Sequence, residues 1–86
     1  MDMSVKVSVE LLSETYNIKT ELAESELLAM RDLLNSKMAI IQEKQPGLNY
    51  KTIAVLSALE IANDYLALKK EYDNLTQLLK EEKLLF

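Results

Sequence analysis

Residues 50–83, YKTIAVLSALEIANDYLALKKEYDNLTQLLKEEK, decide the fold of this 86-residue chain. No Gly or Pro interrupts them, and at 1.5 Å per residue they predict a helix of about 50 Å. Beyond the first turns, its apolar residues step alternately by three and four, the spacing of a heptad seam. This predicted oligomer seam consists of Ala58, Ile61, Tyr65, Leu68, Tyr72, Leu75 and Leu79.

The seam predicts self-association, because the rest of the chain is too short to cover it. The only other predicted helix spans about 25 residues and is joined by a short loop, so it reaches no further than about Leu68. Tight parallel dimers prefer Ile or Val at such positions, and the bulky Tyr65 and Tyr72 therefore favour a wider bundle, such as four helices. Dimer, tetramer and helix orientation remain open at this stage.

The long helix has a clear start. Residues 45–47, Gln-Pro-Gly, end the preceding helix, because Pro cannot continue it and Gly adopts turn angles easily. Asn49 is a good N-cap, and Leu48 and Ile53 stand at the two positions of a hydrophobic staple. We therefore expect the two helices to form a hairpin of neighbours.

The first helix is predicted over residues 21–45, starting between Glu21 and Ser25, where acidic residues suit the positive end of the helix dipole. Its apolar residues recur at helical spacing and widen at Leu28 and Leu33. We interpret this stripe as core packing. Its members are Leu27, Met30, Leu34, Met38 and Ile41.

The N-terminal part reads as a β-hairpin over residues 4–20. Val5, Val7, Val9 and Leu11 alternate with polar residues, a turn falls within residues 12–15, and alternation resumes at Tyr16 and Ile18. The predicted fold is α+β: an N-terminal β-hairpin packed on two helices, the second long and forming an oligomeric coiled coil. We expect a small head over residues 1–62 and a coiled-coil extension over residues 63–86.

The composition argues against catalytic activity and metal binding. The chain lacks Cys and His, which removes thiol chemistry, imidazole catalysis and the usual zinc ligands. It has no Gly-rich phosphate loop and no titratable cluster on a concave apolar face, so we predict no enzyme activity, no catalytic residues and no metal or other cofactor. A small helical enzyme would need a buried charged cluster, whereas both helical stripes are apolar.

The charge and hydropathy of the chain argue against nucleic acid and membrane as partners. A net charge of −4 disfavours nucleic acid, and a ribbon-helix-helix repressor would need a basic strand where Lys6, Ser8 and Glu10 face outward. No apolar run approaches the ~20 residues of a membrane span, so no membrane insertion is expected. The N-terminus shows no signal-peptide pattern, which predicts a cytoplasmic protein.

Three segments, in this order, give the chain a specific resemblance. They are residues 9–18, VELLSETYNI; residues 33–38, LLNSKM; and residues 53–65, IAVLSALEIANDY, followed by Leu68 and Lys69. With the Pro-Gly break between the helices, this sequence resembles the ZapA family, small bacterial proteins associated with the FtsZ cell-division ring. The family usually has Gly where Ser13 stands, and many members carry a basic residue near Glu14 and an acidic one near Lys51.

The resemblance implies a role as well as a fold. It implies dimers formed by the heads, tetramers formed by the long helices, and crosslinking of FtsZ filaments by the heads at the division septum. The alternative is a coiled-coil scaffold or adaptor for a different partner. Polar positions left outward by the apolar stripes are the candidate partner-binding residues: Glu14, Arg31, Lys37 and Lys51.

The last three residues carry one more expectation. Leu84, Leu85 and Phe86 would form a sticky apolar end if they were left in water. We expect them to pack in the oligomer, against the start of a neighbour's long helix. A frayed helix end is the alternative.

Overall fold

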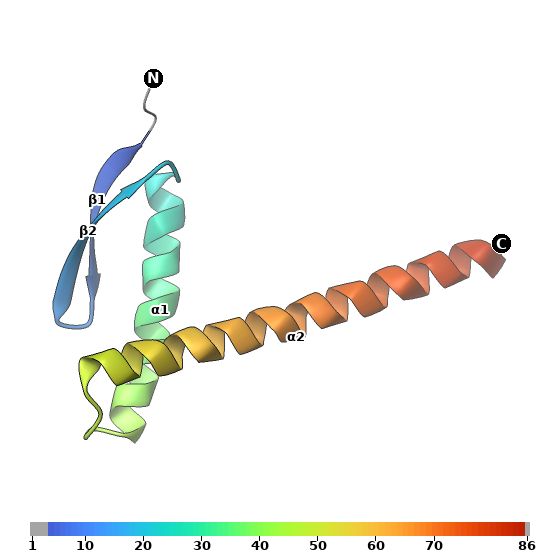
Figure 1. Cartoon of the computed structure of the whole chain (residues 1–86). Helices are drawn as coiled ribbons and strands as arrows, with labels where there is room; N and C mark the ends of the chain where they lie inside the picture. Colours follow the sequence, from blue (N-terminus) through green and yellow to red (C-terminus); the bar gives the residue numbers. More distant parts are fainter. Residues whose placement is uncertain (1–3, 86) are drawn as a thin grey trace.

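The computed structural model describes residues 4–85, with side chains described for residues 4–81. Two strands, β1 (Val5–Leu11) and β2 (Glu14–Thr20), are followed by helices α1 (Glu24–Lys44) and α2 (Tyr50–Leu85). The predicted α+β architecture is confirmed: a β-hairpin lies beside α1, and the long α2 projects away from both (Figure 1). The expectation for the terminal Leu-Leu-Phe falls on side chains outside the described part and stays a prediction.

The hairpin is tighter than the sequence indicated. β1 and β2 pair antiparallel from Val5 with Thr20 to Leu11 with Glu14, so the turn contains only Leu12 and Ser13. Glu14 and Thr15, expected in the turn, belong to β2 instead. Val7 and Val9, on the face turned to α1, bury against Leu27, as period-two alternation requires.

α1 begins at Glu24, inside the predicted window and three residues later than residue 21. The reason is a local turn, in which the Leu22 backbone N–H donates to the Thr20 hydroxyl. α2 begins as predicted, with the Asn49 side chain accepting a hydrogen bond from the Thr52 N–H at 2.8 Å. Leu48 and Ile53 join the same buried cluster, as the hydrophobic staple requires.

The main core lies where α1 and α2 cross. Met38 and Ile41 of α1 bury against Ile53 of α2, and Leu11 and Leu12 of the hairpin pack onto this cluster. Ser57, fully buried next to it, satisfies its hydroxyl by donating to the Ile53 carbonyl one turn earlier. Hairpin, α1 and the start of α2 therefore share one small core.

The two helices are neighbours, as the short loop predicted, but they are in contact over a short stretch only. They cross near the C-terminal end of α1, and α2 then leaves at a steep angle (Figure 1). The Cα radius of gyration is 18.2 Å, against about 12 Å for a compact domain of this size. The contact is short because the apolar side chains that join the helices, at Met38, Ile41 and Ile53, lie near the loop.

Candidate interaction surfaces

The predicted seam on α2 is exposed in the single chain. Ile61 is half-buried, and Ala58 is exposed. Exposed fractions of 52% to 68% apply to the remaining seam residues, which are Tyr65, Leu68, Tyr72, Leu75 and Leu79. Among the large seam residues, exposure begins at Tyr65, before the limit near Leu68 that the length of α1 allowed, because α2 diverges from α1. Large apolar side chains repeating on one face of a projecting helix are typical of an interface with another protein chain.

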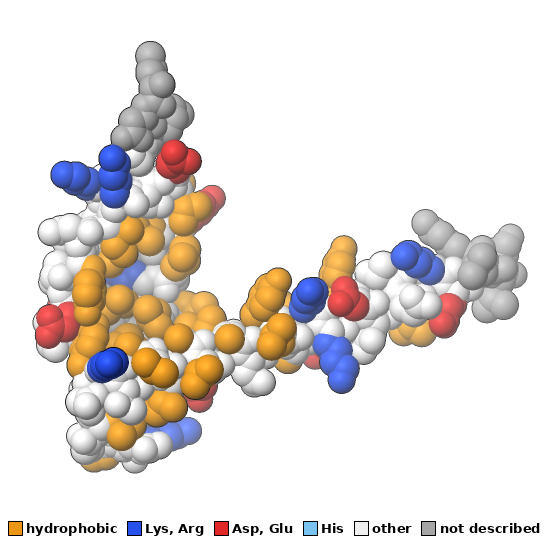
Figure 2. All heavy atoms as spheres, in the orientation of Figure 1, with side chains coloured by type: hydrophobic (Ala, Val, Ile, Leu, Met, Phe, Trp, Pro, Cys, Tyr) orange, Lys and Arg blue, Asp and Glu red, His pale blue; other side chains and the backbone are white. Residues whose placement is uncertain are grey.

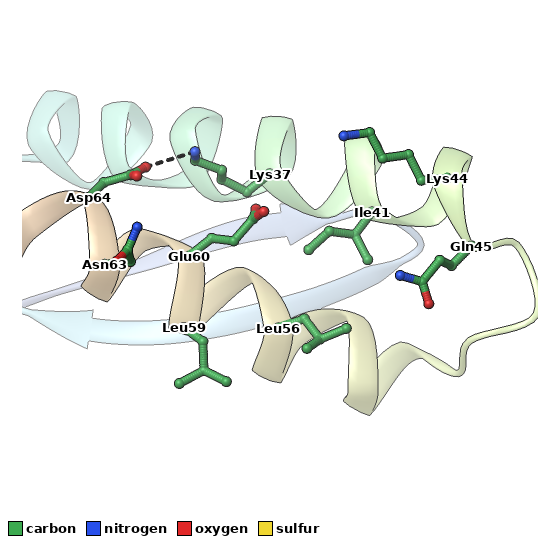
Figure 3. Close-up of a pocket in the computed structure, with 9 residues that line it drawn as sticks. All are labelled: Lys37, Ile41, Lys44, Gln45, Leu56, Leu59, Glu60, Asn63 and Asp64. Atoms are coloured by element: carbon green, nitrogen blue, oxygen red, sulfur yellow. Dashed lines mark ion pairs between the residues drawn. The ribbon is translucent and has the colours of Figure 1, made fainter.

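A second apolar stripe lies on another face of α2. It consists of Val55, Leu59, Ala62 and Leu66, all exposed, and it ends where α2 becomes polar at Lys69 and Lys70. At 100° per residue, its centre lies roughly 120° around the helix from the seam. Figure 3 shows the Leu59 side chain extending away from α1. The first half of α2 thus presents apolar surface in two directions.

The head carries an apolar surface of its own. Hydrophobic side chains gather over the hairpin, α1 and the start of α2 (Figure 2). Met30 and Leu33 of the predicted core stripe are more than half exposed. A nearly apolar hollow of about 140 Å³ lies between hairpin and α1, lined by residues that include Val9, Ile18 and Met30. These residues leave the predicted α1 stripe only partly covered within one chain.

The structure places the four candidate partner-binding residues in two groups. Glu14 starts β2, directly after the turn, and Lys51 lies in the first turn of α2; both are exposed. Arg31 is half-buried and lines a hollow with Leu12 of the turn. Glu14 and Arg31 thus lie beside the hairpin turn, and Lys51 follows Tyr50, whose hydroxyl bonds the Leu11 carbonyl. Lys37 lies apart, at the crossing of the helices.

Arg31 and Lys37 each hold an ion pair. The Arg31 guanidinium donates to the Asp32 carboxylate from Nε at 2.9 Å and from Nη2 at 2.8 Å. The Lys37 ammonium lies 2.8 Å from the Asp64 carboxylate and so links α1 to α2 (Figure 3). Its hydrogen bond to Asp64, the charge of Asp64 and, less strongly, Glu60 raise the pKa of Lys37. A partly exposed pair of this kind contributes little to stability, because water screens the attraction.

Two residues that sequence reasoning missed hold the hairpin turn. The Asn35 side chain accepts from the Leu12 N–H at 2.8 Å and donates to the Glu10 carbonyl at 2.8 Å. The Tyr50 hydroxyl donates to the Leu11 carbonyl at 2.9 Å. Burial, and then the hydroxyl of nearby Tyr16, raise the pKa of Tyr50 to about 12. The one available signal was Asn35 itself, because Asn in mid-helix is unfavourable unless its side chain has another role.

Comparisons with known proteins identify the family. The sequence model of the family described as Cell division protein ZapA matches residues 7–85. The chain belongs to the ZapA family. A relative named Cell division protein ZapA from Geobacillus sp. (strain WCH70) is 37% identical over 78 residues, 91% of this chain and 90% of the relative. Another from Bacillus pumilus (strain SAFR-032) is 34% identical over 77 residues, with 90% of this chain and 91% of the relative covered.

The fold is also that of a solved member of the ZapA family. A ZapA mutant dimer from Geobacillus stearothermophilus superimposes with a TM-score of 0.71 at 34% identity, covering 93% of each chain. The resemblance inferred from the three sequence segments is therefore confirmed. In the described part of the chain, no helix is long and apolar enough to cross a membrane. No group of three or more Asp or Glu side chains there is arranged to hold a metal ion.

Proposed function

We propose that this chain is a non-enzymatic cell-division protein that self-associates through α2 and crosslinks FtsZ filaments through its heads, at the division septum in the cytoplasm. The observation that carries the proposal is the exposed seam on the projecting half of α2. Membership of the ZapA family supports FtsZ as the partner. The long helix supplies the distance between heads that a crosslinker needs.

Self-association is supported by the geometry of α2. The five large seam residues from Tyr65 to Leu79 extend over about 21 Å of helix, and each exposes more than half of its side chain. A monomer would leave this row of apolar side chains in water, which soluble proteins avoid. The matched structure from Geobacillus stearothermophilus is itself a dimer. A second copy of the chain is therefore the natural occupant of the seam.

A tetramer is favoured over a dimer by the second stripe. A helix in a two-stranded coiled coil needs one apolar seam, whereas a helix in a four-helix bundle contacts two neighbours. α2 has the seam and, roughly 120° away, the stripe Val55, Leu59, Ala62 and Leu66. The second stripe stops at Leu66, so the four-helix part is expected in the half of α2 nearest the head.

Filament crosslinking follows from having several heads on one assembly. Each head offers the charged residues Glu14 and Arg31 beside the hairpin turn, Lys51 in the first turn of α2 and Lys37 at the crossing of the helices. A weak contact made by one head is strengthened when a tethered second head binds a neighbouring site. Two heads at the ends of a long bundle reach two filaments, and the result is bundling.

The direct test is co-sedimentation with purified FtsZ polymers. We expect the chain to pellet with the polymers and to increase the amount of FtsZ that pellets at low speed. Failure to pellet with FtsZ would favour a scaffold or adaptor for another partner.

A quadruple charge reversal tests the surface: Glu14→Lys with Arg31→Glu, Lys37→Glu and Lys51→Glu. The matched control, Lys70→Glu with Lys80→Glu, changes the net charge equally at outward heptad positions of α2. We expect the quadruple variant to lose bundling with little change in melting, and the control to keep it. Full bundling by the quadruple variant would reject this surface.

A further inference from the structure

The hairpin turn contains a strained residue. Leu12 has a φ of 56°, in the left-handed region, and it is the only non-glycine residue with positive φ in the described part of the chain. A side chain with a Cβ is disfavoured there, and Gly, Asn or Asp are the usual occupants. Such strain persists only where surrounding contacts hold it, and it often marks a functional segment.

Side chains from both helices stabilise the strained turn. The Asn35 side chain on α1 bonds both the Leu12 N–H and the Glu10 carbonyl, each at 2.8 Å. The Tyr50 hydroxyl on α2 bonds the Leu11 carbonyl at 2.9 Å. These bonds reach 23 to 39 residues along the sequence, so the turn depends on the assembled head.

The packing of Leu12 explains why this left-handed position holds Leu instead of Gly. Its side chain packs on the cluster of Met38, Ile41 and Ile53, where Gly would contribute no contact. The turn therefore combines an anchored side chain with a backbone shape that Leu would not adopt alone. Asn35 and Tyr50 stabilise that shape.

We infer that Asn35 and Tyr50 are positioning residues that hold the hairpin tip in one conformation as a preformed docking element for FtsZ, with Glu14 as the charged group it presents. The inference rests on the proposed function. Glu14 follows the turn directly and is exposed, so any change at Leu12 redirects it. Beside the tip lies a hollow of about 430 Å³, lined by Glu10, Leu12, Arg31, Asp32, Asn35 and Ala39.

Preorganisation is the physical advantage. A free two-residue turn would sample several conformations and lose that freedom on binding, whereas a held turn has little left to lose. The bonds from Asn35 and Tyr50 also fix the tip against the head, where Leu12 and Arg31 line the same hollow. Without them Leu12 relaxes to negative φ, and the tip no longer meets its partner in one orientation.

The test uses the 86-residue chain and three variants of it. Asn35→Ala removes both bonds to the turn, Asn35→Asp keeps only the acceptor for the Leu12 N–H, and Tyr50→Phe removes one hydroxyl. Asn74→Ala is the matched control, the same change at an exposed position on α2. The readouts are hydrogen exchange of the Leu12 amide, mass in solution and affinity for FtsZ polymers.

We expect Asn35→Ala to lose protection of the Leu12 amide and about tenfold in FtsZ affinity at unchanged mass, which corresponds to about 1.4 kcal/mol. Asn35→Asp should recover part of the protection and part of the affinity, Tyr50→Phe should lie between wild type and Asn35→Ala, and Asn74→Ala should match wild type. Wild-type affinity in Asn35→Ala and Tyr50→Phe with an unprotected Leu12 amide would overturn the positioning role. An affinity loss that follows a loss of mass or folding in both variants would do so too.

Failure of the proposed function looks different. If wild type itself does not bind FtsZ polymers, the docking role falls with it, whatever the variants do. The Leu12 amide then still reports whether Asn35 fixes the turn.

Discussion

Replacing Leu75 by Glu should split the helix-mediated association and leave the head folded. Leu75 lies in the distal half of the seam and is 57% exposed in the single chain. It is far from the core of Met38, Ile41 and Ile53, so the head loses no contact. An assembly that depends on the seam should fall to half its mass or less.

The magnitude follows from the exposure of Leu75. Full burial of a Leu side chain contributes about 1.5–3 kcal/mol, and since 57% of this one remains to be buried, association gains about 0.9–1.7 kcal/mol from it. Desolvating an unpaired carboxylate costs at least about 2 kcal/mol more. The change therefore costs about 3 kcal/mol per chain and about 6 kcal/mol per pair, which weakens association by about four orders of magnitude.

Light scattering over a dilution series from micromolar upward measures this effect, and circular dichroism checks that the head stays folded. The matched control is Gln77→Glu, which places the same charge at an exposed position facing away from the seam. It should keep the wild-type mass. An unchanged mass for Leu75→Glu would show that Leu75 is outside the interface and that the heptad register is wrong.

Three further predictions concern the core, the turn and the end of the chain. Met38→Ala, at a side chain only 1% exposed, should destabilise the head by about 2–5 kcal/mol in chemical denaturation, whereas Met30→Ala, the same change at an exposed position, should cost less. The pKa of Tyr50 is raised from 10.0 to about 12, so the stability that its neutral hydroxyl contributes to the fold is present below pH 10 and is lost as the pH rises towards 12. Tyr50→Phe should therefore reduce the fall of the melting temperature between pH 10 and 12, and a fall equal to that of wild type would contradict the raised pKa. Deleting residues 84–86 should lower the melting temperature most at low protein concentration, and curves that match wild type at every dilution would show that the tail is a bystander.

Local patterns predicted the elements well, because each depends on neighbours in sequence. Alternation from Val5 to Leu11 gave β1, and Leu48, Asn49 and Ile53 gave the start of α2. The turn could not be predicted in the same way. The left-handed Leu12 is stabilised by Asn35 and Tyr50, whose distance along the chain hides them from any local rule.

The crossing of the two helices could not be predicted from the sequence either. A short loop predicts adjacent helices, but their crossing angle depends on how the side chains at the contact fit together. The pair between Lys37 and Asp64 arises from that crossing. The candidate partner-binding residues were chosen as outward polar positions, and this choice could not foresee that Arg31 and Lys37 would be held in ion pairs.

The proposed crosslinking is tested most directly by electron microscopy of FtsZ filaments with wild type and with Leu75→Glu, in parallel with co-sedimentation. Crosslinking through α2 predicts thick bundles with wild type, and single filaments with the variant, which still binds through its folded heads. Bundles of equal thickness with the variant, at a concentration where light scattering shows its association to be lost, would contradict crosslinking through the seam.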